Sequence, residues 1–333
     1  MKIDIYTHIL PAKYMEALDK HIGPEQKSFF NTIYVLKTLF DLDYRFRIMD
    51  KFDDLMHVLT LSMPPVENIT DAGKANELAR LANDEMAELV LKYPDRFAAA
   101  VACLPMNSMD AALVEADRAI KDLKFRGVQI FTPTSDKPLD SPEFWPLYEK
   151  MCQYNLPIWV HPQRPPSYPE YKSEKASRYT IHGMLGWPYE TSVAMVRLVF
   201  SGILEKFPSL KLITHHGGAM IPFFEKRIAG WIDSHDILLG RRDSENLRKP
   251  MMDYFKMFYA DTAVYGNTDG LMCSYAFFGA AHLLFGTDMP WDNQLGLRYT
   301  RETIASVEKM PINKGEKKMI FEDNTRQLLR LPV

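Results

Sequence analysis

The chain has 333 residues, a formal net charge of −3 and a hydrophobic fraction of 47%. This balance leaves no basic excess for binding nucleic acid or an anionic membrane surface, so we expect neither as a partner. No apolar run approaches the roughly 20 residues that span a bilayer, no signal peptide precedes the first predicted strand, and the three cysteines are widely spaced. We therefore expect a cytoplasmic protein with free thiols.

Short β-type runs alternate with longer amphipathic helical segments along the chain. The predicted strands are 2–6, 56–61, 97–103, 126–131, 157–161, 211–215, 257–260 and 282–286. The clearest predicted helices are 71–93, one capped by Ser108, one opened by Ser141-Pro142-Glu143, 191–205 and 221–234. Eight strands with intervening helices predict an α/β fold, a (β/α)8 TIM barrel.

The competing architecture is an open, doubly wound sheet. It lacks support because no Gly-x-Gly-x-x-Gly follows an early strand and no Gly-x4-Gly-Lys-Ser/Thr loop is present. We see no repeat or linker, so we expect one domain over residues 1–333. Two long insertions, 9–40 and 162–190, follow the carboxyl ends of strands, so we expect them to arch over the mouth of the barrel.

Three strand ends carry side chains that can bind a metal ion. His8, His161 and Asp288 each follow an apolar strand directly, on the first, fifth and eighth strands. Carboxyl ends of parallel strands share one face, so these residues can converge. Two histidines and one carboxylate suit zinc, manganese or iron. A single histidine at a strand end is more often satisfied by the backbone, but the complete set favours a metal site.

A pair of adjacent histidines follows the sixth strand. His215 and His216 would point to opposite faces of a strand, so only one is expected inside the mouth and the other outside the barrel wall. Gly217-Gly218 then permits close approach of the backbone to a ligand. A histidine beside a metal can act as general acid or base, because its ordinary pKa lies near neutrality.

Tyr6 stands where a His-x-His pair would complete an ordinary metal-binding arm. It has three interpretations: a neutral phenol that binds substrate, a phenolate ligand of the metal, or a side chain that fills the space of a lost ligand. The phenolate requires a large drop from the ordinary pKa of about 10.

Other charged and aromatic side chains could line the pocket. Arg164 follows His161 closely and is placed to meet an anionic substrate, whereas Arg45 is expected in surface salt bridges. Trp187 and Trp291 lie in predicted loops at the same face, where they could bind a planar substrate or anchor their loops.

Several segments together resemble a known family. They are Met1 to Pro11, Arg47-Ile48-Met49-Asp50, Pro157 to Pro162, Gly186 to Thr191, Phe207 to Lys211, His216-Gly217-Gly218 with Pro222-Phe223 and Arg227, and Gly286 to Trp291. Nearly the whole chain resembles the amidohydrolase-related metal enzymes, in the branch of aminocarboxymuconate-semialdehyde decarboxylase and the γ-resorcylate-type hydroxybenzoate decarboxylases.

The resemblance implies a (β/α)8 barrel with one divalent metal ion, zinc first and manganese as the alternative, and a homodimer. It maps His8, His161 and Asp288 onto metal ligands and His216 onto the histidine that assists proton transfer. It gives catalytic roles to His216 and Asp288. Tyr6 departs from the family pattern, which has histidine or glutamate there, and this departure leaves both the metal affinity and the reaction open.

Three functions remain open at this point. The first is a non-oxidative carboxy-lyase that acts on an aromatic or unsaturated cyclic carboxylate, a small molecule bound by Tyr6, Arg164, Trp187 and Trp291. The second is a metal-dependent hydrolase of a C–O or C–N bond in a cyclic substrate. The third is a metal-free binding protein, with Tyr6 as a sign of lost catalysis.

Overall fold

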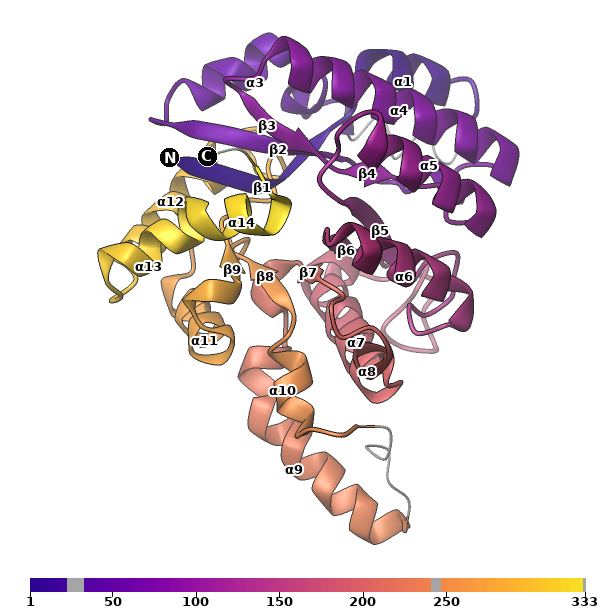
Figure 1. Ribbon diagram of the computed structural model, residues 1–333, viewed down its shortest axis with the longest axis vertical. Coiled ribbons are helices and arrows are strands. Elements are labelled where there is room, and N and C mark those ends of the chain that lie inside the picture. The colour runs from indigo at the N-terminus through magenta and orange to yellow at the C-terminus, as the bar shows by residue number, and fades with distance from the viewer. Residues whose placement is uncertain (23–32, 241–246, 332–333) are drawn as a thin grey trace.

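The computed structural model describes residues 1–22, 33–240 and 247–331. Parallel strands form an inner wall and helices cover its outside (Figure 1). The strands are β1 (Lys2–Ile9), β2 (Leu55–Leu61), β3 (Phe97–Ala100), β4 (Ala102–Cys103), β5 (Val128–Thr132), β6 (Ile158–Pro162), β7 (Leu212–Thr214), β8 (Tyr259–Asp261) and β9 (Leu283–Leu284).

The helices alternate with these strands. They are α1 (Ala12–Leu18), α3 (Leu42–Met49), α4 (Ala72–Lys92), α5 (Met109–Lys121), α6 (Trp145–Tyr154), α7 (Trp187–Phe200), α8 (Ile203–Lys206), α9 (Ile221–Leu239), α10 (Met251–Phe255), α11 (Thr268–Phe278), α12 (Leu297–Lys309), α13 (Lys314–Lys318) and α14 (Asn324–Leu329). Short 3₁₀ or π turns occupy Lys37–Leu39, Val66–Asn68, Pro142–Phe144, His182–Gly186, His216–Gly218, Ala280–His282 and Met319–Asp323.

The strands pair in parallel in the order β1-β2-β3 and β4 through β9. The predicted strand 97–103 is divided at Val101, whose backbone N–H donates to Leu59 O over 2.9 Å and so keeps the two halves beside β2. The segment after β9 lies beside β1: Ile5 N donates to Phe285 O over 2.9 Å, and His8 N donates to Met289 O over 3.0 Å. The predicted (β/α)8 barrel is confirmed.

Apolar side chains fill the inside of the barrel below its mouth. The buried cluster includes Ile3, Ile5, Val58, Val101, Trp159, Ile213 and Leu284, with Leu328 and Leu329 of α14 against it. Trp159 is fully buried, and its indole N–H donates to Ile5 O over 3.1 Å. This packed floor gives the strand ends above it fixed positions, as expected for a barrel whose interior is a core rather than a pore.

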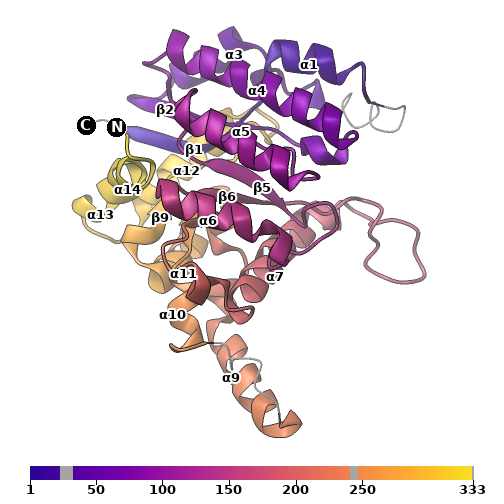
Figure 2. The same ribbon diagram turned by 45° about the vertical axis from the view of Figure 1, so that its right-hand side comes forward.

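The two predicted insertions differ in shape. The first contains α1 and the turn Lys37–Leu39, and its residues 23–32 lie outside the described part of the chain. The second leaves the body of the protein after β6 as a long extended loop (Figure 2) and returns at His182–Gly186. The part of it that reaches the barrel mouth is therefore its carboxyl end, next to α7.

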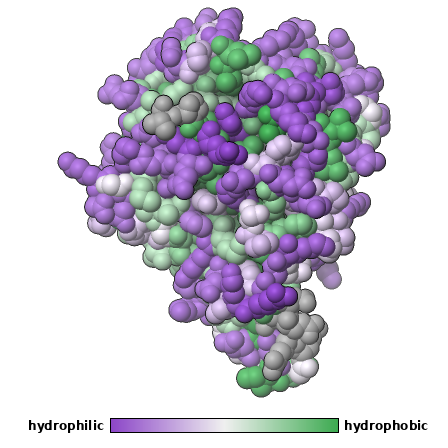
Figure 3. All heavy atoms as spheres, in the orientation of Figure 1, coloured by the Kyte–Doolittle hydropathy of each residue, from purple (hydrophilic) through white to green (hydrophobic). Residues whose placement is uncertain are grey.

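Helix α9 extends away from the barrel (Figures 1 and 2). It has Pro222 in its first turn, where a missing N–H costs no hydrogen bond, and it ends at Gly240, whose φ is 62°. Apolar side chains lie exposed along it, including Phe223, Trp231, Ile237, Leu238 and Leu239, and apolar atoms are visible at the lower end of the molecule in Figure 3. Among the described residues, no helix has both the length and the apolar character needed to cross a bilayer.

Candidate functional site

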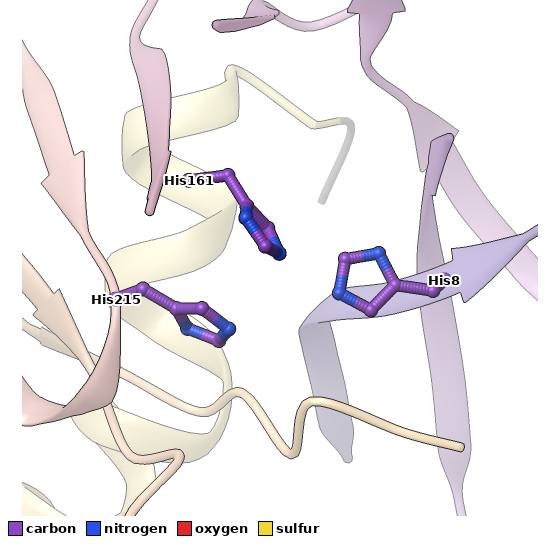
Figure 4. Close-up of side chains that lie close together, drawn as sticks. All are labelled: His8, His161 and His215. Carbon is purple, nitrogen blue, oxygen red and sulfur yellow. The ribbon is translucent and has the colours of Figure 1, made fainter. Parts of the chain in front are cut away.

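Three imidazoles meet at the mouth of the barrel. His8 comes from β1, His161 from β6 and His215 from the residue after β7, and the three side chains point toward one another (Figure 4). Their ligand atoms lie within 4.8 Å of one another, and all three residues are buried. Ligands on opposite sides of an ion with bonds of about 2.1 Å are about 4 Å apart, so the cluster has the size of a metal site.

Each imidazole is held at its Nδ1 atom. His161 Nδ1 lies 2.7 Å from Pro162 O, and His8 Nδ1 lies 3.3 Å from the Thr60 hydroxyl. His215 Nδ1 bonds the Asp261 carboxylate. Histidines that bind metals show this arrangement, because a partner on one ring nitrogen orients the ring and leaves the other nitrogen for the ion.

Asp288 joins the cluster through two oxygen atoms with different surroundings. Its Oδ1 lies 3.1 Å from His8 Nε2 and 3.2 Å from His215 Nε2. Its Oδ2 accepts a hydrogen bond from the Tyr265 hydroxyl over 2.9 Å and lies 3.7 Å from His216 Nε2. The backbone of Asp288 is tied to β1, since its N–H donates to Tyr6 O over 3.1 Å.

Burial and neighbouring charges set the protonation of the site. Burial lowers the pKa of His8 and, more strongly, that of His161, so both rings are neutral and able to bind a cation. Burial opposes charge on His215 as well, but Asp261 and Asp288 raise its pKa to about 10, so a cation that binds at Nε2 would have to displace a proton from this ring. Burial would raise the pKa of Asp288, but the neighbouring His215 outweighs it and holds this pKa well below its usual range.

The expectation that one of the adjacent histidines lies outside the barrel wall was wrong. His215 is buried in the mouth, and its ring lies 3.9 Å from that of His216, which also approaches Asp288. The reason is that β7 ends at Thr214, so the alternation of a strand does not extend to these residues. His216 has a left-handed backbone, with φ 58°, and Gly217 continues the turn with φ 65°.

Tyr6 lies directly beside these histidines. Its ring stacks on that of His215, with a centroid distance of 3.9 Å and an interplanar angle of 13°, and its ring centre lies 5.7 Å from that of His8. Burial, and then the charges of Asp261 and Asp288, raise the pKa of Tyr6 well above its usual value, so its hydroxyl is protonated. That hydroxyl is buried without a hydrogen-bond partner in the described part of the chain.

Two tryptophans flank the cluster on different sides. The Trp187 ring lies 6.0 Å from His161, and the Trp291 ring lies 6.1 Å from His8, both at steep angles. Arg164 forms an ion pair with Glu190, to which its guanidinium donates over 2.6 Å. The structure thus brings the tryptophans to the metal-sized cluster and places Arg164 in an ion pair near the start of α7.

Arg45 is not at the surface, contrary to expectation. It is completely buried, and its guanidinium donates to His8 O and to Thr38 O and lies 3.2 Å from His57 Nδ1. Burial lowers its pKa to about 9. The charged helical pattern around Arg45 did not reveal that this side chain is buried. The burial arises because Arg45 lies behind β1 and holds the first insertion against that strand.

Two residues of the site were missed from the sequence. Asp261 orients His215 and also accepts from Gly217 N over 3.1 Å, and Tyr265 contacts Asp288 and His216. Asp261 could have been found, because it ends β8, while His8 lies one residue before the end of β1 and Asp288 lies shortly after β9. Tyr265 carries no such signal, since it lies in a loop four residues further on.

A parallel β/α barrel with three buried imidazoles and a carboxylate at the carboxyl ends of its strands has the architecture of a metal-dependent barrel enzyme, and this donor set fits a divalent transition metal. The profile of the family described as Amidohydrolase matches residues 3–331. The chain belongs to that family.

The chain is similar to several decarboxylases, both in sequence and in structure. The chain is 32% identical to γ-resorcylate decarboxylase of Polaromonas sp. strain JS666, over 87% of each chain. It is 31% identical to γ-resorcylate decarboxylase of Rhizobium sp. strain MTP-10005, over 84% of this chain and 86% of that one. Among solved structures, 2,6-dihydroxybenzoate decarboxylase with bound 2,6-dihydroxybenzoate matches with a TM-score of 0.79 at 28% identity, over 99% of this chain and 98% of that chain. The dihydroxybenzoic acid decarboxylase of Polaromonas sp. JS666, with bound manganese and the inhibitor 2-nitroresorcinol, matches with a TM-score of 0.76 at 27% identity, over 99% of this chain and 96% of that chain.

Proposed function

We propose that this protein is a metal-dependent, non-oxidative decarboxylase of an aromatic or unsaturated cyclic carboxylate. The observation that carries the proposal is the convergence of His8, His161, His215 and Asp288 in one buried cluster. It occurs in a chain whose curated relatives at 31–32% identity are named as decarboxylases of γ-resorcylate.

We propose that His8, His161 and Asp288 bind one divalent ion and that His215 Nε2 contributes to the same site. Zinc is the metal we expect first. Manganese is the alternative, in line with its presence in the related structure with 2-nitroresorcinol. When bound, the ion would supply a positive charge that holds the substrate carboxylate and a neighbouring ring oxygen in a fixed orientation.

The remaining chemistry belongs to the chain itself. Trp187 and Trp291 lie beside His161 and His8, where their rings can contact a planar substrate. Asp288 and His216 relay one proton from solvent to the ring carbon that bears the carboxylate: a C–H bond forms there, the C–C bond to the carboxylate breaks with its electron pair remaining on the ring, and CO2 leaves. The Tyr6 hydroxyl, protonated and unpartnered, is available to bind substrate.

The test is release of labelled CO2. Protein purified without added metal and then loaded with zinc or manganese is incubated with carboxyl-¹³C aromatic acids, beginning with 2,6-dihydroxybenzoate. We expect ¹³CO2 from the loaded protein and at least a hundredfold less from His216→Ala, the usual scale for a general acid–base group. Retention of the label by every acid, or incorporation of ¹⁸O from water with cleavage of a C–O or C–N bond instead, would contradict the proposal and favour a hydrolase.

We also propose that the protein is a homodimer and that α9 takes part in the contact. In support, Phe223 is 77% exposed and Ile237 is 83% exposed. A largely apolar groove of about 430 Å³ lies between α7 and α9, with Val196, Phe224 and Trp231 in its lining. Large exposed apolar surfaces are typical of protein contacts. We expect a dimer in sedimentation at micromolar concentration and a monomer for Ile237→Asp; a monomeric wild type would contradict this.

Residues 1–333 are proposed to act as one domain in the cytoplasm. The backbone hydrogen bonds that join the two sheets at Val101 and at Phe285 support the first statement, and the three cysteines, all free, support the second. A single cooperative unfolding transition and recovery of the protein in the cytosolic fraction are the expected results.

A further inference from the structure

Tyr265 occupies a position that neither the strand pattern nor the family comparison assigns. Its hydroxyl lies between two groups of the site, 2.9 Å from Asp288 Oδ2 and 3.2 Å from His216 Nε2. The backbone of Tyr265 is left-handed, with φ 54°, and Gly266 follows with φ 84°. A bulky residue seldom adopts this conformation, and such outliers concentrate at functional sites.

The direction of the two hydrogen bonds follows from the chemistry of the partners. A carboxylate only accepts, so the Tyr265 hydroxyl donates its proton to Asp288 Oδ2. The hydroxyl oxygen of Tyr265 must then accept from His216 Nε2. This requires the hydrogen of the neutral His216 ring to be on Nε2. His216 Nδ1 is consequently an acceptor, and it is buried without a hydrogen-bond partner among the described residues.

The Tyr265 hydroxyl also gives the two carboxylate oxygens of Asp288 different partners. Oδ2 is held by Tyr265, while Oδ1 faces His8 and His215. A carboxylate that is anchored at one oxygen presents the other in a fixed direction, which is the role that outer partners play around metal sites.

We propose that Tyr265 is a positioning residue that fixes the orientation of Asp288 and the tautomer of His216. Tyr265 acts through these two groups and does not touch the substrate. The proposal rests on the proposed function for its effect on turnover, but its effects on the His216 ring and on metal affinity do not depend on the reaction.

The variant that tests this is Tyr265→Phe, which removes the hydroxyl and keeps the ring. The matched control is Tyr299→Phe, because the Tyr299 ring stacks on Tyr265 at 4.2 Å and loses the same atom. The first measurement uses metal-free protein with ¹⁵N-labelled histidine. We expect the His216 ring to carry its hydrogen on Nε2 in the wild type and in Tyr299→Phe, and to become a mixture of tautomers in Tyr265→Phe.

The second measurement is manganese affinity by competition with a chelator, followed by turnover of 2,6-dihydroxybenzoate. For Tyr265→Phe we expect roughly tenfold weaker metal binding, a kcat at least about tenfold lower and a KM changed by less than about threefold, as for loss of an outer partner. Tyr299→Phe should stay within twofold of the wild type in each quantity.

Three results would overturn the proposal. They are an unchanged His216 tautomer in Tyr265→Phe, a metal affinity within twofold of the wild type, and equal losses in Tyr265→Phe and Tyr299→Phe, which would assign the effect to the stacked rings. A wild-type protein that releases no CO2 from any acid tested would instead overturn the proposed function, and the ring spectra and metal titration would still decide the role of Tyr265.

Discussion

Replacing Asp261 by asparagine tests whether His215 belongs to the metal centre. In the native protein Asp261 Oδ2 accepts from His215 Nδ1, while Oδ1 accepts from Gly217 N over 3.1 Å and from Ala263 N over 3.0 Å. The amide oxygen of asparagine can keep both backbone bonds. Its NH2 group then faces Nδ1 and donates to it, which moves the ring hydrogen to Nε2, the nitrogen that should face the ion.

The expected size of the effect follows from this reversal of the hydrogen bond. An outer partner of a metal-bound histidine typically contributes 10- to 100-fold to metal affinity or activity, so we expect a loss of about that size in both. The fold should persist, because the two bonds that hold the β8 end remain. The free energy of unfolding should fall by roughly 1.5–3 kcal/mol at most, the usual contribution of a hydrogen bond to a charged group.

The assay is manganese and zinc affinity by chelator competition, with urea unfolding in parallel. Asp292→Asn is the control, because Asp292 is a buried carboxylate that likewise accepts from two backbone N–H groups, those of Gln294 and Tyr299. Metal affinity and turnover within twofold of the wild type in Asp261→Asn, with intact structure, would refute the reasoning and leave His215 as a packing residue.

Three further predictions follow from the same site. His215→Ala should lose metal, while His216→Ala should keep about one equivalent and lose roughly a hundredfold in turnover; elemental analysis with kinetics checks both, and the opposite order would reverse the two assignments. Tyr6→Phe should keep its metal and lose turnover; loss of metal would instead identify a phenolate ligand. Asp4 is buried and its pKa is raised to about 7, so the folded protein binds a proton more tightly than the unfolded chain does. Its carboxyl therefore costs stability progressively as pH rises from about 4 to 7, on the order of 4 kcal/mol in full. Asp4→Asn should remove that dependence in urea unfolding measured from pH 4 to 8, and equal slopes for the two proteins would contradict it.

The sequence was sufficient where a local pattern determines the structure. Alternating strands and helices predicted the barrel, and the rule that polar side chains at strand ends converge predicted that His8, His161 and Asp288 lie together, as they do in the structure. The helix over 71–93 was predicted from apolar residues at spacings of three and four, and the structure has α4 at Ala72–Lys92, with the Asp71 side chain accepting from Gly73 N and Lys74 N at its start.

Other parts of the site depend on backbone turns and burial that single residues do not reveal. The left-handed conformation of His216 allows both histidines to enter the mouth, and a strand pattern predicts the opposite. The sequence around Arg45 has the pattern of a surface charge, but in the fold β1, β2 and the first insertion bury this side chain. Asp261 obeys the same rule as the other strand ends, but the predicted strand stopped one residue before it.

The pairing of His8 with Asp288 joins residues 280 positions apart, through the contact between β1 and the segment that follows β9. A nascent chain leaving the ribosome therefore carries His8 from the beginning but completes this pair only after residue 288 has emerged. A ribosome-bound chain stalled before that residue should hold its metal weakly. Translation past the last strand, β9, is thus the step that completes the His8–Asp288 pair, and chains released before it are expected to lack a complete metal-binding cluster.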